Sequence, residues 1–383
     1  MTQLVAKRFS QAKDSVLAMA AAGKATYTDL IDLSIGDTDF TTDPRIIHAA
    51  MDDALAGHTH YTHPQGDPEL IEAIQAFYAR TYGMALKKNE IFVTASSCIG
   101  MALALMSTLD PGDEVLLLAP YFFPYKEQIE LAGGVAVEVP TFEEEGFAID
   151  PNRLEAAITP RTKGIILNNP CNPTGAAYDL QTYHTVARAA QMHGLVVLAD
   201  EIYTDYMYTL PFVPLRSVEG MAEHTITLNS FSKNYIMTGW RIGYVVAPPP
   251  VVDAMRRINE NLVFSAPSVS QRAALHALRL RDEIGDRYTS AYRERVFYCA
   301  QRINAIPTLS VRPPQGTFYL FMNIRKTGLS SLDFCRRLLS EAHVAMVPGI
   351  GFGAAGEGYA RIACTTSIAN LKEAFDRIEC IKW

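Results

Sequence analysis

Short runs of apolar, often β-branched residues alternate with amphipathic stretches through the middle of the chain, from residue 91 to residue 246. Runs of this kind, separated by helical segments such as Leu180–His193, predict a mostly parallel sheet that helices cover on both faces. The predicted strands are Ile91–Thr94, Glu114–Leu118, Val135–Val139, Gly164–Leu167, Val196–Ala199, Thr225–Leu228 and Ile242–Val246.

The pattern differs on both sides of this block. Helices are predicted at Ser10–Ala22 and Pro44–Ala56 before it, and at Arg281–Arg302, Ser331–Ala342 and Ile368–Cys380 after it, where strands are also expected at Gly316–Phe321 and Val344–Val347. We therefore expect an α/β protein whose large domain, residues 46–280, holds a seven-stranded, mostly parallel sheet. Residues 1–45 and 281–383 would form a smaller α+β domain.

Composition limits the partners and the location. The 383 residues carry a net charge of −7, which argues against nucleic acid as a partner, because binding a phosphate backbone needs a basic surface. The sequence has no uncharged apolar run of roughly 18 residues that could span a membrane. The stretch Met1–Phe9 carries charges before any apolar run of signal-peptide length, so we expect a cytoplasmic protein.

Cysteines and histidines give little support to a metal site. The six cysteines include no C-x-x-C pair and fit free thiols in a reducing compartment. His58, His60 and His63 lie close together in a loop that contains Pro and Gly, but no carboxylate or thiolate joins them at ligand spacing. We therefore expect no bound metal.

Polar and aromatic residues follow several of the predicted strands. A ligand of an open parallel sheet binds beyond the carboxyl ends of the strands, so these residues are expected to meet at one edge. The start of a helix at Ser96, Ser97 and Cys98 offers free N–H groups to an anion. The other residues at this edge are an aromatic cluster at 121–125 that includes Phe122, the polar loop 168–175 with Asn172, and the pair Asp200 and Tyr203.

The segment 230–243 sets Lys233 among the hydroxyl residues Ser230 and Ser232, with Arg241 eight positions further on. A deprotonated lysine can form a Schiff base with an aldehyde, and hydroxyls and a guanidinium are natural phosphate ligands. This combination suits a covalent aldehyde cofactor that carries a phosphate. Gly36, in a polar turn of the N-terminal segment, permits close approach to the backbone.

Three motifs together resemble the class I/II aminotransferases of fold type I, which depend on pyridoxal 5′-phosphate and include aspartate aminotransferases. They are Asn-Pro-x-Asn-Pro-Thr-Gly at 169–175, Asp-Glu-x-Tyr at 200–203, and Ser-x-Ser-Lys followed by Thr-Gly-Trp-Arg-Ile-Gly at 230–243. The likeness extends from Gly36 to Arg361. Phe122 stands where tryptophan is frequent in the family, Ser96, Ser97 and Cys98 replace a more glycine-rich start, and Ile236 replaces a smaller residue.

The resemblance implies a role for each site residue. Lys233 would form the Schiff base and carry a proton between the substrate Cα and the cofactor. Asp200 would pair with the ring nitrogen, Asn172 and Tyr203 would bind the ring hydroxyl, and Phe122 would stack on the ring. Arg361 would bind the substrate carboxylate, beside Asn172 and the backbone of Gly36. The residues implied around the phosphate and the adjoining part of the cofactor are Ser96, Ser97, Cys98, Ser230, Ser232, Arg241 and, from the second subunit of a homodimer, Tyr61.

The resemblance implies an aminotransferase that moves an amino group from an L-amino acid to a 2-oxo acid by a ping-pong mechanism. A carbon–sulfur β-lyase of the same fold is the alternative, and a PLP-sensing regulator is a further one, although about 45 residues before the large domain leave no room for a DNA-binding domain. An oxidoreductase is excluded because no G-x-G-x-x-G follows the first strand.

The donor side chain stays open between aspartate, aromatic and aliphatic amino acids. A dicarboxylate donor requires a second cation, for which the candidates are His60, Lys13 and arginines on the helices after residue 255. An aromatic or aliphatic donor would fit the aromatic residues Phe40, Phe122, Phe123 and Tyr125.

Overall fold

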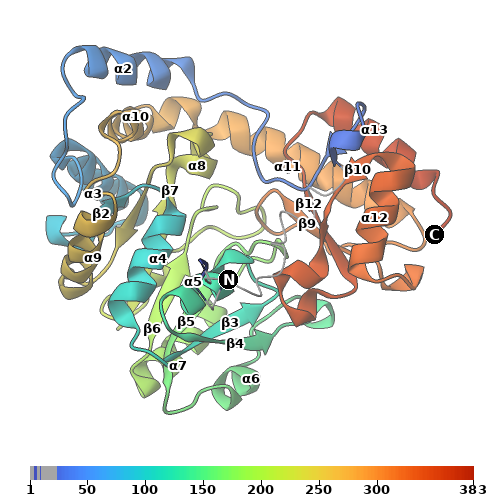
Figure 1. Cartoon of the computed structure of the whole chain (residues 1–383), viewed down its shortest axis with the longest axis horizontal. Coiled ribbons are helices and arrows are strands. Elements are labelled where there is room, and N and C mark those ends of the chain that lie inside the picture. Colours follow the sequence, from blue (N-terminus) through green and yellow to red (C-terminus); the bar gives the residue numbers. More distant parts are fainter. Residues whose placement is uncertain (1–3, 7–8, 10–23) are drawn as a thin grey trace.

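The large sheet has the architecture that the apolar runs predict (Figure 1). The computed structural model describes residues 4–6, 9 and 24–383, so the predicted helix at Ser10–Ala22 lies outside the described residues. Within this part, seven strands pair in the order β2-β8-β7-β6-β5-β3-β4, and β8 alone runs antiparallel to its neighbours. The strands are β2 (Ile91–Thr94), β3 (Glu114–Ala119), β4 (Val135–Pro140), β5 (Thr162–Asn168), β6 (Val196–Asp200), β7 (Thr225–Ser230) and β8 (Gly243–Val246).

Helices cover both faces of this sheet, as expected. Alternate residues of a strand point to opposite faces, so in β6 Val197 packs in a core with α7 and Leu198 packs in a core with α4. The helices that precede the small domain are α2 (Pro44–Leu55), α3 (Pro68–Tyr82), α4 (Ser97–Thr108), α5 (Pro124–Leu131), α6 (Pro151–Ala156), α7 (Leu180–His193), α8 (Phe231–Asn234), α9 (Pro249–Leu262) and α10 (Ser268–Arg279).

The C-terminal part forms a second, smaller unit around β9 (Tyr319–Asn323) and β12 (Tyr359–Ala363). The helices α11 (Arg281–Ala305), α12 (Ser331–Ala342) and α13 (Ile368–Glu379) share one apolar core with these strands. In Figure 1, α12 and α13 lie beside the two strands, away from the large sheet.

The N-terminal segment joins this smaller unit. Its strand β1 (Ile31–Asp32) pairs in parallel with β10 (Val344–Ala345). The sequence predicts a single strand over Val344–Val347, but the structure splits it, because β11 (Val347–Pro348) pairs with β12 instead. The predicted strand Gly316–Phe321 begins three residues later, at Tyr319. None of the helices described here is long and apolar enough to cross a membrane.

Candidate active site

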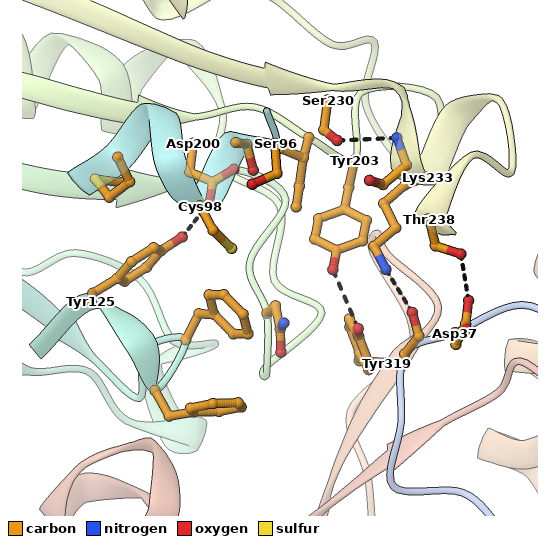
Figure 2. A pocket seen from close by; sticks show the side chains of 18 of the residues that line it. Asp37, Ser96, Cys98, Tyr125, Asp200, Tyr203, Ser230, Lys233, Thr238 and Tyr319 are labelled. Atoms are coloured by element: carbon orange, nitrogen blue, oxygen red, sulfur yellow. Dashed lines mark hydrogen bonds between the residues drawn. The ribbon is translucent and has the colours of Figure 1, made fainter. Parts of the chain in front are cut away.

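The predicted site residues gather around one cavity of about 340 Å³ (Figure 2). Its wall is formed by the carboxyl ends of large-sheet strands on one side and by β9, β12 and the N-terminal segment on the other. Every predicted site residue except Tyr61 lines it: Gly36, Ser96, Ser97, Cys98, Phe122, Asn172, Asp200, Tyr203, Ser230, Ser232, Lys233, Arg241 and Arg361.

Lys233 connects the two sides of the cavity. It lies in the short helix α8, directly after β7, and its Nζ donates a hydrogen bond of 2.6 Å to the carbonyl oxygen of Gly36. A Cβ atom at Gly36 would lie 1.7 Å from the phenol oxygen of Tyr319, so only glycine allows this backbone path. The amine is therefore held inside the cavity and has no carboxylate partner among the described residues.

Asp200, the last residue of β6, presents one engaged and one free carboxylate oxygen. Its Oδ2 accepts a hydrogen bond of 2.5 Å from the phenol of Tyr125, while its buried Oδ1 accepts none from the described residues. Burial raises the pKa of this carboxyl to about 6, against the lowering effects of the Tyr125 hydroxyl and, after it, of the Ile202 backbone N–H. A buried acceptor without a donor fits a protonated ring nitrogen, which supplies an N–H and a positive charge.

The start of α4 and the segment after β7 form an anion-binding end of the cavity. The first N–H groups of α4 have no acceptor within their own helix, and the helix dipole favours negative charge there. Gly243 allows this approach, since a Cβ at that position would lie 2.8 Å from the backbone nitrogen of Ser97. The Ser230 hydroxyl accepts from the Ser232 backbone N–H at 3.0 Å and thereby caps α8. The exposed guanidinium of Arg241 donates to the carbonyl of Thr238 at 2.8 Å.

Arg361 is a buried cation without an anionic partner among the described residues. It exposes 2% of its surface and donates to Asn172 Oδ1 at 3.0 Å and to the carbonyl of Ser34 at 2.7 Å. Its Nε has no acceptor there. Burial lowers the pKa of the guanidinium, although arginine stays protonated at physiological pH. A buried charge of this kind is stabilised by an opposite charge, so the site suits a carboxylate ligand.

Tyr203 and the aromatic cluster complete the wall. The Tyr203 hydroxyl donates to that of Tyr319 at 3.3 Å, and burial raises its pKa well above the usual value. Phe122 and Phe123 line the cavity with their ring centres 5.0 Å apart. Both offer a flat apolar face, as the sequence predicts for Phe122.

One expectation about the donor pocket is wrong. Phe40 lies outside the cavity lining, because its ring packs in the core against Tyr288 and Tyr292, with centres 5.3 and 5.7 Å away. Tyr125 lines the cavity as expected, and its hydroxyl donates a hydrogen bond to Asp200. Nothing in the local sequence reveals this bond, since the two residues are 75 positions apart.

Among the described residues, none of the candidates for a second cation lines the cavity. The cations that line the cavity are Lys233, Arg241 and Arg361, with no arginine from the helices after residue 255. His60 lines a separate cavity, and Lys13 lies outside the described residues. The described part of the chain contains no group of three or more histidine, cysteine or acidic residues that could hold a metal ion.

Tyr61 does not line this cavity. Its side chain is 86% exposed, contacts Phe264 edge to face with ring centres 5.1 Å apart, and lines the same separate cavity as His60. The sequence prediction places Tyr61 in the site of a second subunit, so its position within one chain leaves that prediction standing.

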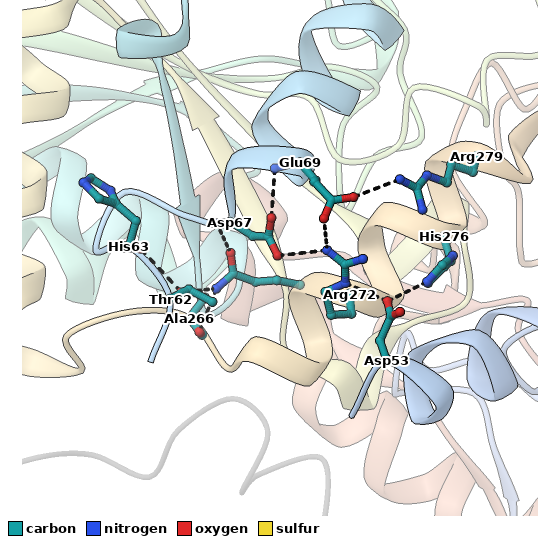
Figure 3. A network of polar contacts seen from close by, with 10 residues as sticks. Asp53, Thr62, His63, Asp67, Glu69, Ala266, Arg272, His276 and Arg279 are labelled. Atoms are coloured by element: carbon teal, nitrogen blue, oxygen red, sulfur yellow. Dashed lines mark hydrogen bonds and ion pairs between the residues drawn. The ribbon is translucent and has the colours of Figure 1, made fainter. Parts of the chain in front are cut away.

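The loop that carries Tyr61 is fastened to α10 (Figure 3). The fully buried amide of Gln271 donates to the hydroxyl of Thr62 at 2.8 Å and accepts from the backbone N–H of Asp67 at 2.6 Å. Arg272, the next residue of α10, donates to Asp67 Oδ2 at 3.3 Å. Thr62, the residue directly after Tyr61, and Asp67 at the end of the loop are thereby held by α10.

Comparison with known proteins agrees with this site. A sequence profile for the family described as aminotransferase class I and II matches residues 28–378. An aspartate aminotransferase from Pyrococcus horikoshii is 38% identical over 354 residues, which cover 92% of this chain and 90% of the relative. An aromatic-amino-acid aminotransferase from Thermococcus litoralis is 38% identical over 91% of each chain. The structure of aspartate aminotransferase from Thermus thermophilus with maleate gives a TM-score of 0.92 at 36% identity and 98% coverage of each chain.

Proposed function

Because the chain belongs to the class I and II aminotransferases, a family of transferases that depend on pyridoxal 5′-phosphate, we propose that it moves the amino group of an L-amino acid to a 2-oxo acid in a ping-pong reaction. The observation that carries this proposal is a single cavity that combines the Lys233 amine, the Asp200 Oδ1 and the Arg361 guanidinium, where Oδ1 has no donor and the guanidinium no anionic partner among the described residues. These are the base, the ring partner and the carboxylate ligand that amino transfer needs.

The cavity residues fit the cofactor at each of its polar groups. Asp200 Oδ1 would accept the hydrogen bond of the protonated ring nitrogen, and Asn172 and Tyr203 would bind the ring hydroxyl. The start of α4 at Ser97, together with Arg241, would hold the phosphate. When bound, the cofactor ring supplies an electron sink that makes the Cα–H bond of an attached amino acid acidic.

Lys233 and Arg361 act on the substrate. Arg361 binds the α-carboxylate and replaces its hydration, which orients the Cα–H bond toward the lysine side of the cavity. Lys233 would act as the base that takes the proton from the substrate Cα and as the acid that gives it back. The same residues run the return half of the reaction with a 2-oxo acid.

We further propose that the enzyme is a homodimer in which Tyr61 reaches the phosphate in the partner's site. The support is an exposed apolar group next to Tyr61, formed by Leu262, Val263 and Phe264. A large exposed tyrosine on a fastened loop is typical of a residue that meets a second protein surface.

Two further proposals concern the cellular compartment of the protein and the boundaries of its two domains. The six cysteines, all of them in the described residues, are free, which suits a reducing compartment such as the cytoplasm. We also propose the division into a large domain, residues 46–280, and a small domain built from residues 1–45 and 281–383. Its support is the pairing of β1 with β10, which joins the two ends of the chain.

A half-reaction panel tests the proposed activity. Single L-amino acids, including acidic, aromatic and aliphatic ones, are added to the purified enzyme with its cofactor, and the visible absorbance of the bound cofactor is followed. We expect at least one amino acid to convert the cofactor to its amine form and to release the matching 2-oxo acid. Release of pyruvate and ammonia with no acceptor present would instead favour the carbon–sulfur lyase alternative.

A further inference from the structure

The contact between Tyr125 and Asp200 joins two buried polar groups on neighbouring elements. Tyr125 stands at the second position of α5 and exposes 3% of its surface, while Asp200 ends β6 and exposes 5%. Their hydrogen bond of 2.5 Å is short for an O–H donor and a carboxylate acceptor, as expected for a charge-assisted bond. In Figure 2 the phenol of Tyr125 points at Asp200.

Further contacts hold the backbone of Asp200 and the backbone and ring of Tyr125. The backbone oxygen of Asp200 accepts from the backbone N–H of Asn169 at 3.1 Å and from the side-chain amide of Asn168 at 2.9 Å. The Tyr125 backbone N–H donates to the carbonyl of Phe122 at 3.1 Å, and the two rings meet edge to face. The main chain of Asp200 is thus held by its neighbours, and its carboxylate is held by Tyr125 through Oδ2.

The hydroxyl of Tyr125 has a role that packing does not explain. The adjoining cluster contains Phe122 and Phe123, so an aromatic ring without a hydroxyl is accommodated in this part of the wall. Burial raises the pKa of Tyr125 well above its usual value, so the phenol keeps its proton and acts as a donor. Asp200 Oδ1 is meanwhile left without a donor in the described residues.

We propose that Tyr125 is a positioning residue that fixes Oδ2 of Asp200, so that Oδ1 is the oxygen which faces the ring nitrogen of the bound cofactor. This inference rests on the proposed function, because it assigns Asp200 to that nitrogen. Without the phenol, the carboxylate would turn about its own bond and would lose a hydrogen bond that stabilises its ionised form in a buried place.

The experiment compares two cofactors on the apoenzyme. Wild type and Tyr125→Phe are titrated at one pH with pyridoxal 5′-phosphate and with its 1-deaza analogue, in which a CH group replaces the ring nitrogen. We expect the variant to bind pyridoxal 5′-phosphate about tenfold more weakly, which is the size of effect expected when a hydrogen bond to a charged group is lost. The analogue should bind both proteins within a factor of two, because it offers Asp200 no N–H.

The control is Tyr121→Phe. Tyr121 is a buried phenol in the loop before α5, and it donates to Glu138 at 2.8 Å instead of to Asp200. It should change the affinity for neither cofactor. A second arm repeats Tyr125→Phe in an Asp200→Asn background, where the loss for pyridoxal 5′-phosphate should shrink to less than threefold.

The outcomes separate this inference from the proposed function. Equal weakening of both cofactors by Tyr125→Phe, or no weakening of either, overturns the positioning role. The amino-acid half-reaction of the wild-type enzyme is measured independently. Its failure would count against the proposed function, even if Tyr125→Phe weakens the binding of pyridoxal 5′-phosphate and not that of the analogue.

Discussion

Arg361 donates a hydrogen bond of 3.0 Å to the side-chain oxygen of Asn172. The residue proposed to bind the substrate carboxylate is therefore in contact with a residue proposed to bind the cofactor. The two residues come from β12 and from the polar loop after β5, 189 positions apart. A substrate bound to Arg361 is therefore linked to the group that would bind the ring hydroxyl. This contact would join the proposed substrate end of the cavity to its proposed cofactor end.

The first prediction concerns Arg361→Lys. Lysine keeps the charge but loses the planar fork that pairs with both carboxylate oxygens, and it cannot bridge Asn172 and Ser34 together. We expect kcat/KM for the preferred amino acid to fall by roughly 100-fold, the effect of losing about 3 kcal/mol of charge-assisted bonding. Cofactor affinity of the apoenzyme should stay within threefold. Unchanged kcat/KM would remove Arg361 from the substrate site.

The second prediction concerns Lys233→Ala. The phosphate ligands and Asp200 are untouched by this change, so the variant should still bind pyridoxal 5′-phosphate, but without a covalent bond. Borohydride reduction followed by mass spectrometry should show the cofactor attached to the wild-type protein and to no residue of the variant. A persistent adduct would mean that another lysine is the reactive one.

The third prediction concerns the pH dependence of stability at Glu201. Burial raises the pKa of this carboxyl to about 8 in the folded protein, while its ordinary value is near 4.5. Between these values the folded state holds a proton that the unfolded state has lost, so the free energy of unfolding falls as pH rises, by at most about 1.4 kcal/mol per pH unit.

Glu201→Gln removes this titration and keeps an acceptor for the backbone N–H of Leu215. Denaturant unfolding at pH 6.5 and pH 8 should show a smaller loss of stability in the variant than in the wild type. This window lies above the value of about 6 for Asp200, which limits the contribution of that neighbour. Equal losses in the two proteins would contradict a titrating Glu201.

The fourth prediction concerns the network of Figure 3. Arg272 is buried and donates to Asp53 at 2.6 Å and to Glu69 at 2.9 Å, besides its contact with Asp67. Arg272→Leu leaves these carboxylates without their shared cation, and we expect it to lower the free energy of unfolding by about 3 kcal/mol.

Arg279→Leu is the matched control. Arg279 pairs with the same Glu69 at 3.1 Å, but its side chain is half exposed, so its removal should cost less than about 1 kcal/mol. Chemical denaturation of both variants measures the difference. Similar costs for the two arginines would show that burial of Arg272 adds nothing to the network.

The sequence was sufficient for the large sheet, because its strands are short apolar runs and most of them are buried on both faces, the edge strand β4 being the exception. The sequence predicted strands less reliably where strand pairing, and not apolar composition, determines where a strand begins and ends. Val344–Val347 reads as one apolar run, yet its two halves pair with β1 and β12. The order of the apolar runs predicted that Asp200 and the segment of Lys233 lie at one edge of the sheet, while the roles of these residues came from the family resemblance.

Other features depended on contacts that no local pattern reveals. The bond from Tyr125 to Asp200 and the packing of Phe40 against Tyr288 both join elements that are far apart in the chain. The aromatic residues were recognised as a group, but their individual roles depend on which of them carries a hydroxyl and what that hydroxyl reaches.

Transfer of labelled nitrogen tests the central claim most directly. The purified enzyme with its cofactor is mixed with the preferred donor as its ¹⁵N-labelled L-amino acid and with an unlabelled 2-oxo acid, and the products are analysed by mass spectrometry. We predict that the label appears in the new amino acid formed from the 2-oxo acid, and that Lys233→Ala forms none. Label recovered as free ammonium, with no labelled amino acid, would contradict the account.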